Sequence, residues 1–193
     1  MRRGSMSILR HLCGIERRGG RNRARLLIER CTMHGTALAL LLANVFSTIF
    51  MTGLIWFVQV VHYPLFARVG PAEFPAYSRA HQTWTTLVVG PPMLVEALTA
   101  ALLVVVRPVG VSAALTWAGL VLVGVIWLST AALQVPSHAK LVQGFDPTIG
   151  SFLVQTNWIR TIAWTARTAI VLAMLAQVMQ SMSRGIGSST GAV

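Results

Sequence analysis

The sequence predicts an all-α integral membrane protein: a four-helix transmembrane bundle with both termini on the cytoplasmic side. Hydrophobic residues make up 54% of the 193 residues and charged residues only 11%, whereas a soluble domain carries roughly 25% charged residues. The mean hydropathy is +0.65. Four stretches are apolar over the roughly 20 residues that a helix needs to cross a bilayer. We therefore expect a multi-pass protein of a bacterial inner (plasma) membrane.

The first transmembrane helix is expected over 36–62, because no Asp, Glu, Lys or Arg occurs there. Pro64 should end this helix, since proline lacks the N–H group that a continuing helix needs. A polar connection over 63–82 should follow, with a short helix over 74–81 in the membrane interface. Aromatic residues of this part are expected to anchor the interface: Tyr63, Phe66, Tyr77 and Trp84.

The second helix is expected over 84–106 and the third over 112–135. Gly90-Pro91-Pro92 should bend the second helix, because prolines interrupt its hydrogen-bond ladder. Pro136 should end the third helix for the same reason as Pro64. A second polar connection then leads to the last span.

The two ends of the chain differ from its middle. Residues 1–32 hold nine arginines and two glutamates, which predicts a disordered basic leader outside the transmembrane domain of 33–182. Met33 stands just before the first span, so we hypothesise that translation of the natural protein starts there; alternatively, the Arg-rich, acid-poor leader resembles an organelle transit peptide. The fourth helix is expected over 158–182, and the tail over 183–193 should be disordered.

The charge distribution predicts the orientation. Lys and Arg beside a span stay in the cytoplasm, so the nine arginines of the leader place the N-terminus inside. Four spans then return the C-terminus to the same side and put both polar connections outside. A basic segment can also bind nucleic acid, but beside a span the topogenic role is expected, and no nucleic-acid partner is predicted.

The first and third helices share a short motif. Gly53-Leu54-Ile55-Trp56 is matched by Gly124-Val125-Ile126-Trp127, and each helix then reaches a Gln, a Pro and a His. Two helix hairpins of similar construction would produce this pattern, and so would chance.

Glu96 and Arg167 are ionisable residues deep inside the predicted spans, where a charge costs ~2.5–3.5 kcal/mol. Counted from the start of each helix, the two residues lie at similar depth, so we predict that they face the interior and pair. The pair is either part of a ligand pocket or a salt bridge that only fixes the helix register.

A polar stripe runs along the fourth helix. At 100° per residue its members fall within an arc of about 80°: Asn157, Arg160, Trp164 and Arg167. Two arginines on an interior wall suit a small hydrophobic or anionic ligand with an electron-rich oxygen, such as a carboxylate, phenolate or quinone. The stripe therefore predicts a polar pocket near the outer leaflet.

Three histidines lie on or near the outer surface: His62, His81 and His138. Imidazoles together with the Glu96 carboxylate would suit a metal ion, and two imidazoles would suit haem. The chain has no His or Cys spacing typical of such sites, so ordinary interfacial histidines are the alternative. The cofactor stays unknown, and a cofactor-free site is one option.

The connection between the third and fourth helices carries a family resemblance. Pro136-Ser137-His138-Ala139-Lys140-Leu141, followed by Asn157-Trp158-Ile159-Arg160-Thr161, resembles the second half of the anthrone-oxygenase-like family of small four-helix membrane proteins. The chain has His138 where that family more often has Asn. The resemblance implies a cofactor-free oxygenase acting on a phenolic or polycyclic substrate. It would make Arg160, Asn157 and His138 the polar wall of the site.

Three functions fit these features. The first is a small membrane oxidoreductase or oxygenase with a polar pocket near the outer leaflet. The second is a non-catalytic accessory or scaffold subunit, alone or in an oligomer, because no known catalytic motif occurs. The third is a small transporter, for which the Gly90-Pro91-Pro92 interruption would mark a discontinuous helix.

Overall fold

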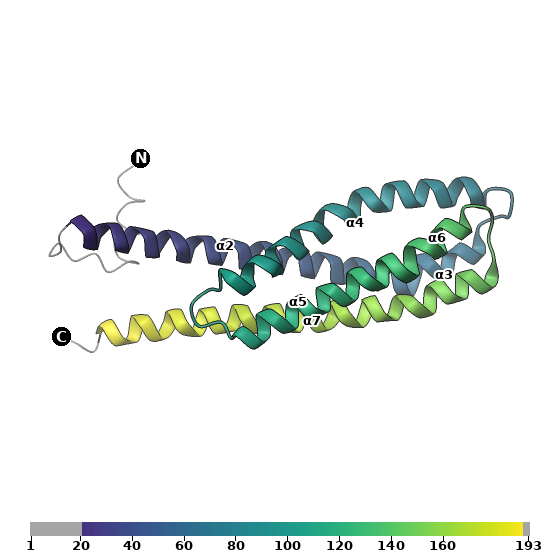
Figure 1. Cartoon of the computed structure of the whole chain (residues 1–193). Helices are drawn as coiled ribbons and strands as arrows, with labels where there is room; N and C mark the ends of the chain where they lie inside the picture. Colours follow the sequence, from purple (N-terminus) through teal and green to yellow (C-terminus); the bar gives the residue numbers. More distant parts are fainter. Residues whose placement is uncertain (1–20, 191–193) are drawn as a thin grey trace, which may run out of the picture.

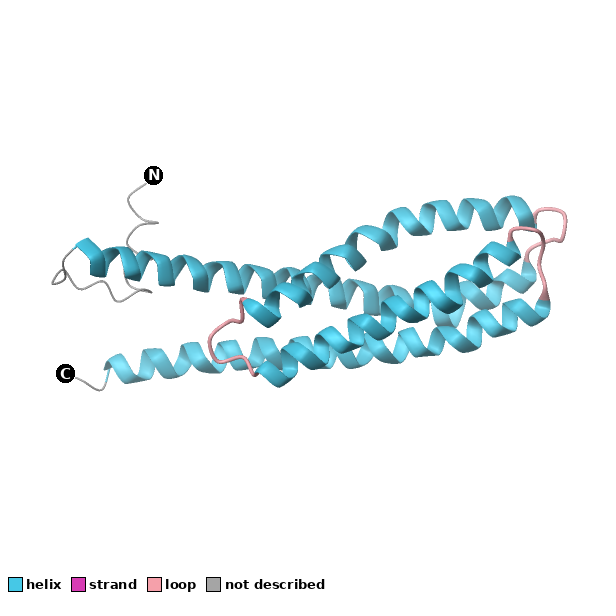
Figure 2. Ribbon diagram, in the orientation of Figure 1, coloured by secondary structure: helices cyan, strands magenta, loops and turns pink. Residues whose placement is uncertain are grey.

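The computed structural model of the chain describes the backbone of residues 21–190 and the side chains of residues 32–184. Four helices of the described part are long and apolar enough to cross a membrane: Thr32–Arg68, Phe74–Val105, Ala113–Leu141 and Pro147–Arg184. The helices lie side by side, and the described residues contain no strand (Figures 1 and 2). The chain is therefore all-helical, as predicted, and compatible with an integral multi-pass membrane protein.

Two of the four long helices are built from several segments. The first consists of α2 (Arg21–Phe57), the π-helix η1 (Val58–His62), α3 (Tyr63–Leu65) and the 3-10 turn η2 (Phe66–Arg68). The third consists of α5 (Ala113–Ser129), the π-helix η3 (Thr130–Gln134) and α6 (Val135–Leu141). The second and fourth are the single helices α4 (Phe74–Val105) and α7 (Pro147–Thr190).

The prediction that Pro64 and Pro136 end their helices was wrong. Each proline lies two residues after a five-residue π-helix and is the second residue of the α-helix that follows. Proline is tolerated in the first turn of an α-helix, and a π-turn widens the backbone just before it. The chain therefore passes through both prolines without losing its helical path.

The first and third helices do correspond to each other. Both the π-helices (from 58 and from 130) and the prolines (64 and 136) lie 72 positions apart. The Gly-x-Ile-Trp motifs, which start at 53 and 124, lie 71 positions apart. The two helices thus share a π-helix followed by a proline, and the short sequence motif is one residue out of register with these features.

Helices extend further than expected at several places. The separate helix over 74–81 is instead the first part of α4, since Pro75 sits in its first turn, where proline is favoured. Residues 21–32 and 183–190 are helical rather than disordered, because a helix grows readily once an adjacent span has nucleated it. The predictions for 1–20 and 191–193 lie outside the described residues.

The interior consists of two apolar clusters. α2 packs against α4 and α7, and α5 packs against the same two helices. One cluster, around Met51, Ile55 and Phe74, lies toward the end that carries His62, His81 and His138, which we call the histidine end. The other, around Leu41 and Leu103, lies toward the opposite end. As predicted, α4, which contains Pro91 and Pro92, is bent in its middle part (Figure 1).

Candidate functional site

A central polar layer separates the two apolar clusters. The Nε atom of Arg167 lies 2.8 Å from Oε1 of Glu96, and each side chain is only 1% exposed. The predicted pair is therefore present and faces the interior. It joins α4 to α7 across the bundle.

Every side-chain oxygen and nitrogen of this ion pair has a partner. The Thr48 hydroxyl donates to Glu96 Oε1 at 2.8 Å, and the Trp164 indole donates to Oε2 at 2.9 Å. The remaining guanidinium nitrogens of Arg167 donate to the Gly119 carbonyl oxygen, to Asn44 Oδ1 and to the Thr48 hydroxyl. The central layer is thus a saturated hydrogen-bond network, which is the arrangement that makes a buried ion pair tolerable.

A second polar cluster occupies the histidine end. His62 Nε2 lies 2.8 Å from His81 Nδ1, and the Thr85 hydroxyl lies 3.0 Å from the same Nδ1 atom. The Tyr63 hydroxyl lies 2.9 Å from His138 Nε2. The rings of His81 and His138 are 5.2 Å apart, centroid to centroid. The three predicted histidines therefore meet, and their neighbour is Tyr63 rather than Glu96.

These histidines are not arranged as a metal-binding set. Within the part of the chain whose side chains are described, no group of three or more His, Cys, Asp or Glu residues has the geometry to hold a metal ion. His81 and His62 bond to each other through ring nitrogens, and His138 bonds to a phenol. The cluster is a hydrogen-bonded network beside a cavity.

The cavity at the histidine end has a volume of about 240 Å³. Three irregularities of the helices surround it. η1 contributes Val58, η3 contributes Thr130 and Gln134, and the residues that flank the proline pair of α4, Val89 and Met93, form another wall. Such irregularities occur often at functional sites, because they displace a helix from its neighbours and redirect side chains. The polar members of the lining are Tyr63, His81, Gln82, Thr85, Thr86, Thr130, Gln134, His138 and Arg160.

Arg160 is the buried cation of this cavity. Its side chain is 7% exposed, and its guanidinium carbon lies 5.4 Å from the centre of the Trp164 ring. It also interacts electrostatically with Tyr63. Among the described side chains, no Asp or Glu forms an ion pair with Arg160, and its Nε atom has no hydrogen-bond partner. Arg167 differs, because it has a carboxylate partner and each of its nitrogens is bonded.

Two other lining residues also carry unbonded buried atoms. Gln134 is 1% exposed, yet its Oε1 atom has no partner, and the Nδ1 atom of His138 has none either. Native proteins leave few buried polar atoms unbonded, and an unexplained group points to water or a ligand. Among the described residues that line this cavity, three buried polar atoms therefore lack a hydrogen-bond partner: Arg160 Nε, Gln134 Oε1 and His138 Nδ1.

The polar stripe of α7 divides between the two clusters. All four members are buried, as predicted. Arg160 lines the cavity, whereas Trp164 and Arg167 belong to the central layer. Asn157 lies apart from both and donates from Nδ2 to Gln59 Oε1 at 2.9 Å. Among the described residues, the side chains that line the 240 Å³ cavity therefore include Arg160 but not Glu96, Asn157, Trp164 or Arg167.

Two functional candidates are not predicted by the sequence. Tyr63, expected in the interfacial aromatic belt, is only 6% exposed and forms a wall of the cavity. Phe66, expected in the same belt, is buried as well. Gln134 belongs to the shared motif of the first and third helices, and a Gln at the end of an uncharged helix is a signal for an interior hydrogen-bonding position.

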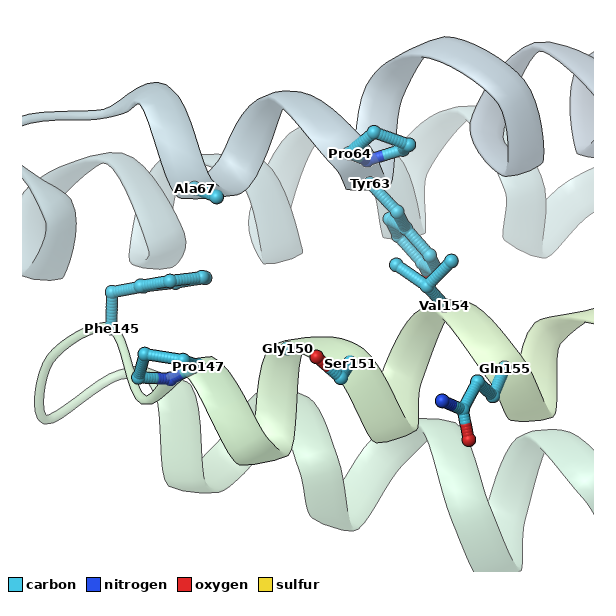
Figure 3. A pocket seen from close by; sticks show the side chains of 9 residues that line it. All are labelled: Tyr63, Pro64, Ala67, Phe145, Pro147, Gly150, Ser151, Val154 and Gln155. Atoms are coloured by element: carbon cyan, nitrogen blue, oxygen red, sulfur yellow. The ribbon is translucent and has the colours of Figure 1, made fainter.

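A second hollow lies on the other side of Tyr63 (Figure 3). It has a volume of about 330 Å³ and lies between α3 and the start of α7. Tyr63 lines both hollows, and in Figure 3 its ring reaches from α3 toward Val154 of α7. Since the Tyr63 hydroxyl is bonded to His138, this ring acts as a partition between the two spaces.

The fold and the site together define a class of protein: four membrane-compatible helices that enclose a saturated ionic layer and, at one end, a cavity with an unpaired cation. Comparison with protein-family models, curated proteins and solved structures found no match for this chain. The resemblance to the anthrone-oxygenase-like family therefore stays a prediction that rests on the residues around Pro136 and Arg160 alone.

Proposed function

We propose that this chain is a small membrane oxidoreductase or oxygenase-like protein, whose cavity at the histidine end binds a compact molecule with an electron-rich oxygen. The chemical class we infer is a phenol or a quinone. The histidine end would lie on the outer side of a plasma membrane, as the basic N-terminal segment suggests.

The observation that carries this proposal is the unpaired Arg160. A buried guanidinium is costly unless hydrogen bonds and opposite charge compensate it. The protein supplies a tyrosine hydroxyl and an indole face to Arg160 but no carboxylate. A phenolate, carboxylate or quinone oxygen bound in the cavity would complete its shell, because guanidinium matches such oxygens in geometry and charge.

The size of the cavity narrows the ligand class. Sites for drug-sized molecules usually measure about 300–1,000 Å³, whereas this cavity has about 240 Å³. Its deeper lining is apolar, with Met51, Ile55 and Met93 among its members. A head of one or two fused rings fits these features better than a large polycyclic system.

The His138 imidazole offers a hydrogen-bond acceptor to a phenol in this cavity. In the tautomer in which Nε2–H donates to the Tyr63 oxygen, the Nδ1 atom is an acceptor without a partner. A phenolic O–H would donate to Nδ1, and its oxygen would lie beside the Arg160 guanidinium. The family resemblance implies a cofactor-free oxygenase that acts on such a phenolic substrate.

The transporter and scaffold alternatives find less support. The transporter was expected to have a discontinuous helix at Gly90-Pro91-Pro92, but α4 runs without a break from Phe74 to Val105. A scaffold subunit needs no unpaired cation beside a cavity, because a buried unpaired charge lowers stability without a compensating ligand.

Binding of a defined probe tests the proposal. We expect the purified protein in lipid nanodiscs to bind 2-hydroxy-1,4-naphthoquinone, measured by isothermal titration calorimetry. Arg160→Gln should weaken binding about 10- to 100-fold, since hydrogen bonds to charged groups contribute about 1.5–3 kcal/mol. The exposed Arg79 at the same end provides the control Arg79→Gln. No binding, or equal binding by the wild type and Arg160→Gln, would refute the proposal.

A further inference from the structure

The cavity at the histidine end opens along the seam between α4 and α6. Thr86 of α4 and Val135 of α6 both line the cavity, and both are exposed on the surface of the bundle. The Gln82 side chain donates to the His138 carbonyl oxygen at 3.0 Å, which fixes the register of these antiparallel segments. Thr86 lies four residues beyond Gln82, and Val135 lies three residues before His138. The two residues therefore face each other across the seam and form the rim of the cavity.

The bend of α4 lies close to this seam. Pro91 and Pro92 lie inside the helix, about one and a half turns beyond Thr86. Between the bend and the histidine end, α4 and α6 approach each other (Figure 1), and the Gln82–His138 hydrogen bond joins them there. Among the residues that line the cavity, those from α2 and α7 are not exposed, and these two helices pack against each other.

The rim lies where a membrane would meet the protein. The residues that follow Thr86 on α4, Leu87 and Val88, are 60% and 51% exposed, and Val135 is 58% exposed. Such a surface suits lipid chains. Trp84, which is 68% exposed, stands two residues from Thr86, as expected for a residue near the headgroups.

The depth of the rim agrees with this assignment. Trp56 lies eight residues from Thr48 of the central layer, which is about 12 Å along the helix. Arg107 lies eleven residues from Glu96 on the other side of the layer, which is about 16 Å. The layer is thus near the middle of a hydrocarbon core about 30 Å thick. Thr86 lies ten residues from Glu96, about 15 Å away, at the edge of that core.

The second hollow offers the competing route from water. Its lining includes Ser151 and Gln155, and it lies further from the central layer than the rim does. However, the buried Tyr63 ring separates this hollow from the cavity, and its hydroxyl is held by His138 (Figure 3). No such partition stands at the α4–α6 seam, where both rim residues are exposed to the surroundings.

We propose that the cavity takes its ligand from the membrane through the α4–α6 seam, and that this ligand is an amphiphile. Its head is the phenol or quinone ring of the proposed function, on which this inference rests, and it lies beside Arg160. Its tail is a prenyl or alkyl chain, which passes between Thr86 and Val135 and lies among the lipid chains of the outer leaflet.

Two probes that differ only in the tail test this inference in nanodiscs. They are 2-hydroxy-1,4-naphthoquinone and its 3-undecyl derivative. Thr86→Trp fills the rim from α4, Val135→Trp fills it from α6, and Ser151→Trp is the matched control in the second hollow. We expect each rim variant to weaken binding of the tailed probe at least tenfold, while Ser151→Trp binds it as the wild type does. Size-exclusion profiles and melting temperatures check that each variant is folded.

The possible failures are distinguishable. If both rim variants bind the tailed probe like the wild type, while Arg160→Gln still loses the tailless probe, the seam is wrong and the proposed function stands. If Ser151→Trp alone weakens the tailed probe, the ligand reaches the site from the water side past Tyr63. If the wild type binds neither probe, both the proposed function and this inference fall.

Discussion

Two buried arginines on one helix have opposite surroundings. Arg167 is bonded through every nitrogen to Glu96, Asn44, Thr48 or Gly119, and it belongs to a layer that ties four helices together. Arg160 lies seven residues away on the same face, without a carboxylate and beside a cavity. The difference teaches that burial of a charge inside a predicted membrane span does not by itself mark a functional site. The candidate site is marked instead by Arg160, whose charge has no carboxylate partner among the described residues and whose Nε has no hydrogen-bond partner there.

The largest effect should follow from breaking the saturated layer. Arg167→Ala leaves the Glu96 carboxylate buried without its cation, and removing one partner of such a pair costs about 3–5 kcal/mol. We expect loss of a monodisperse peak in mild detergent, or a strongly lowered melting temperature. The double variant Glu96→Leu with Arg167→Met should recover much of the loss, because both charges are then gone. A stable Arg167→Ala protein that fails only in probe binding would instead assign this layer to the binding site.

Substitution of Arg160, unlike that of Arg167, should not lower the stability of the protein. Arg160→Met removes a buried cation that has no carboxylate partner, so the melting temperature should stay the same or rise. Binding of the hydroxynaphthoquinone should nevertheless fall, about 10-fold or more, because the oxygen loses its charged donor. Differential scanning fluorimetry and calorimetry on the same sample measure both quantities. A large loss of stability would mean that Arg160, like Arg167, serves the fold.

A matched pair of threonines sharpens the comparison further. Thr48→Val removes the hydroxyl that donates to Glu96 Oε1 and accepts from Arg167, which should cost about 1–3 kcal/mol. Thr85→Val removes a hydroxyl from His81, whose Nδ1 still has His62, and should cost less than about 0.5 kcal/mol. Thermal unfolding in detergent compares the two. Equal losses would show that the histidine end is as tightly integrated as the central layer.

The smallest effect on ligand binding is expected at the partition. Tyr63→Phe keeps the ring between the two hollows and removes only the hydroxyl that is bonded to His138. The stability should change by about 1 kcal/mol. Binding of the tailed probe should stay within about threefold of the wild type, since the seam supplies access. A marked change in the association rate of the probe would show that the partition opens during binding.

The central layer was predictable in part. Glu96 and Arg167 stood out as charges in apolar stretches, and counting residues from the helix starts placed them at one depth. Their partners Asn44, Thr48 and Gly119 were not predictable, because an uncharged polar residue or a glycine in a span has many possible roles. Only the packing of α2 and α5 against the pair reveals that they complete it.

The cavity was less predictable than the layer. The pocket on the wall of the fourth helix was expected, but its shape depends on how far α4 bends and on two π-helices that propensity does not foresee. The sequence predicts helix ends at Pro64 and Pro136, because proline usually interrupts a helix. In both helices, however, the proline follows a π-helix and the helix continues past it. A proline shortly after a polar residue can therefore indicate a π-helix rather than a helix end.

The distribution of tryptophans gives this protein a built-in optical reporter. Five of the six are at least 38% exposed on the surface of the bundle, and Trp164 alone has no exposure. Brominated lipids should therefore extinguish the fluorescence of the outer five and leave the emission of one indole. That indole is bonded to Glu96 on its edge and faces Arg160 across its ring. The remaining emission spectrum of Trp164 should therefore respond both to changes in the ionic layer and to ligand binding in the neighbouring cavity, and no added label is needed.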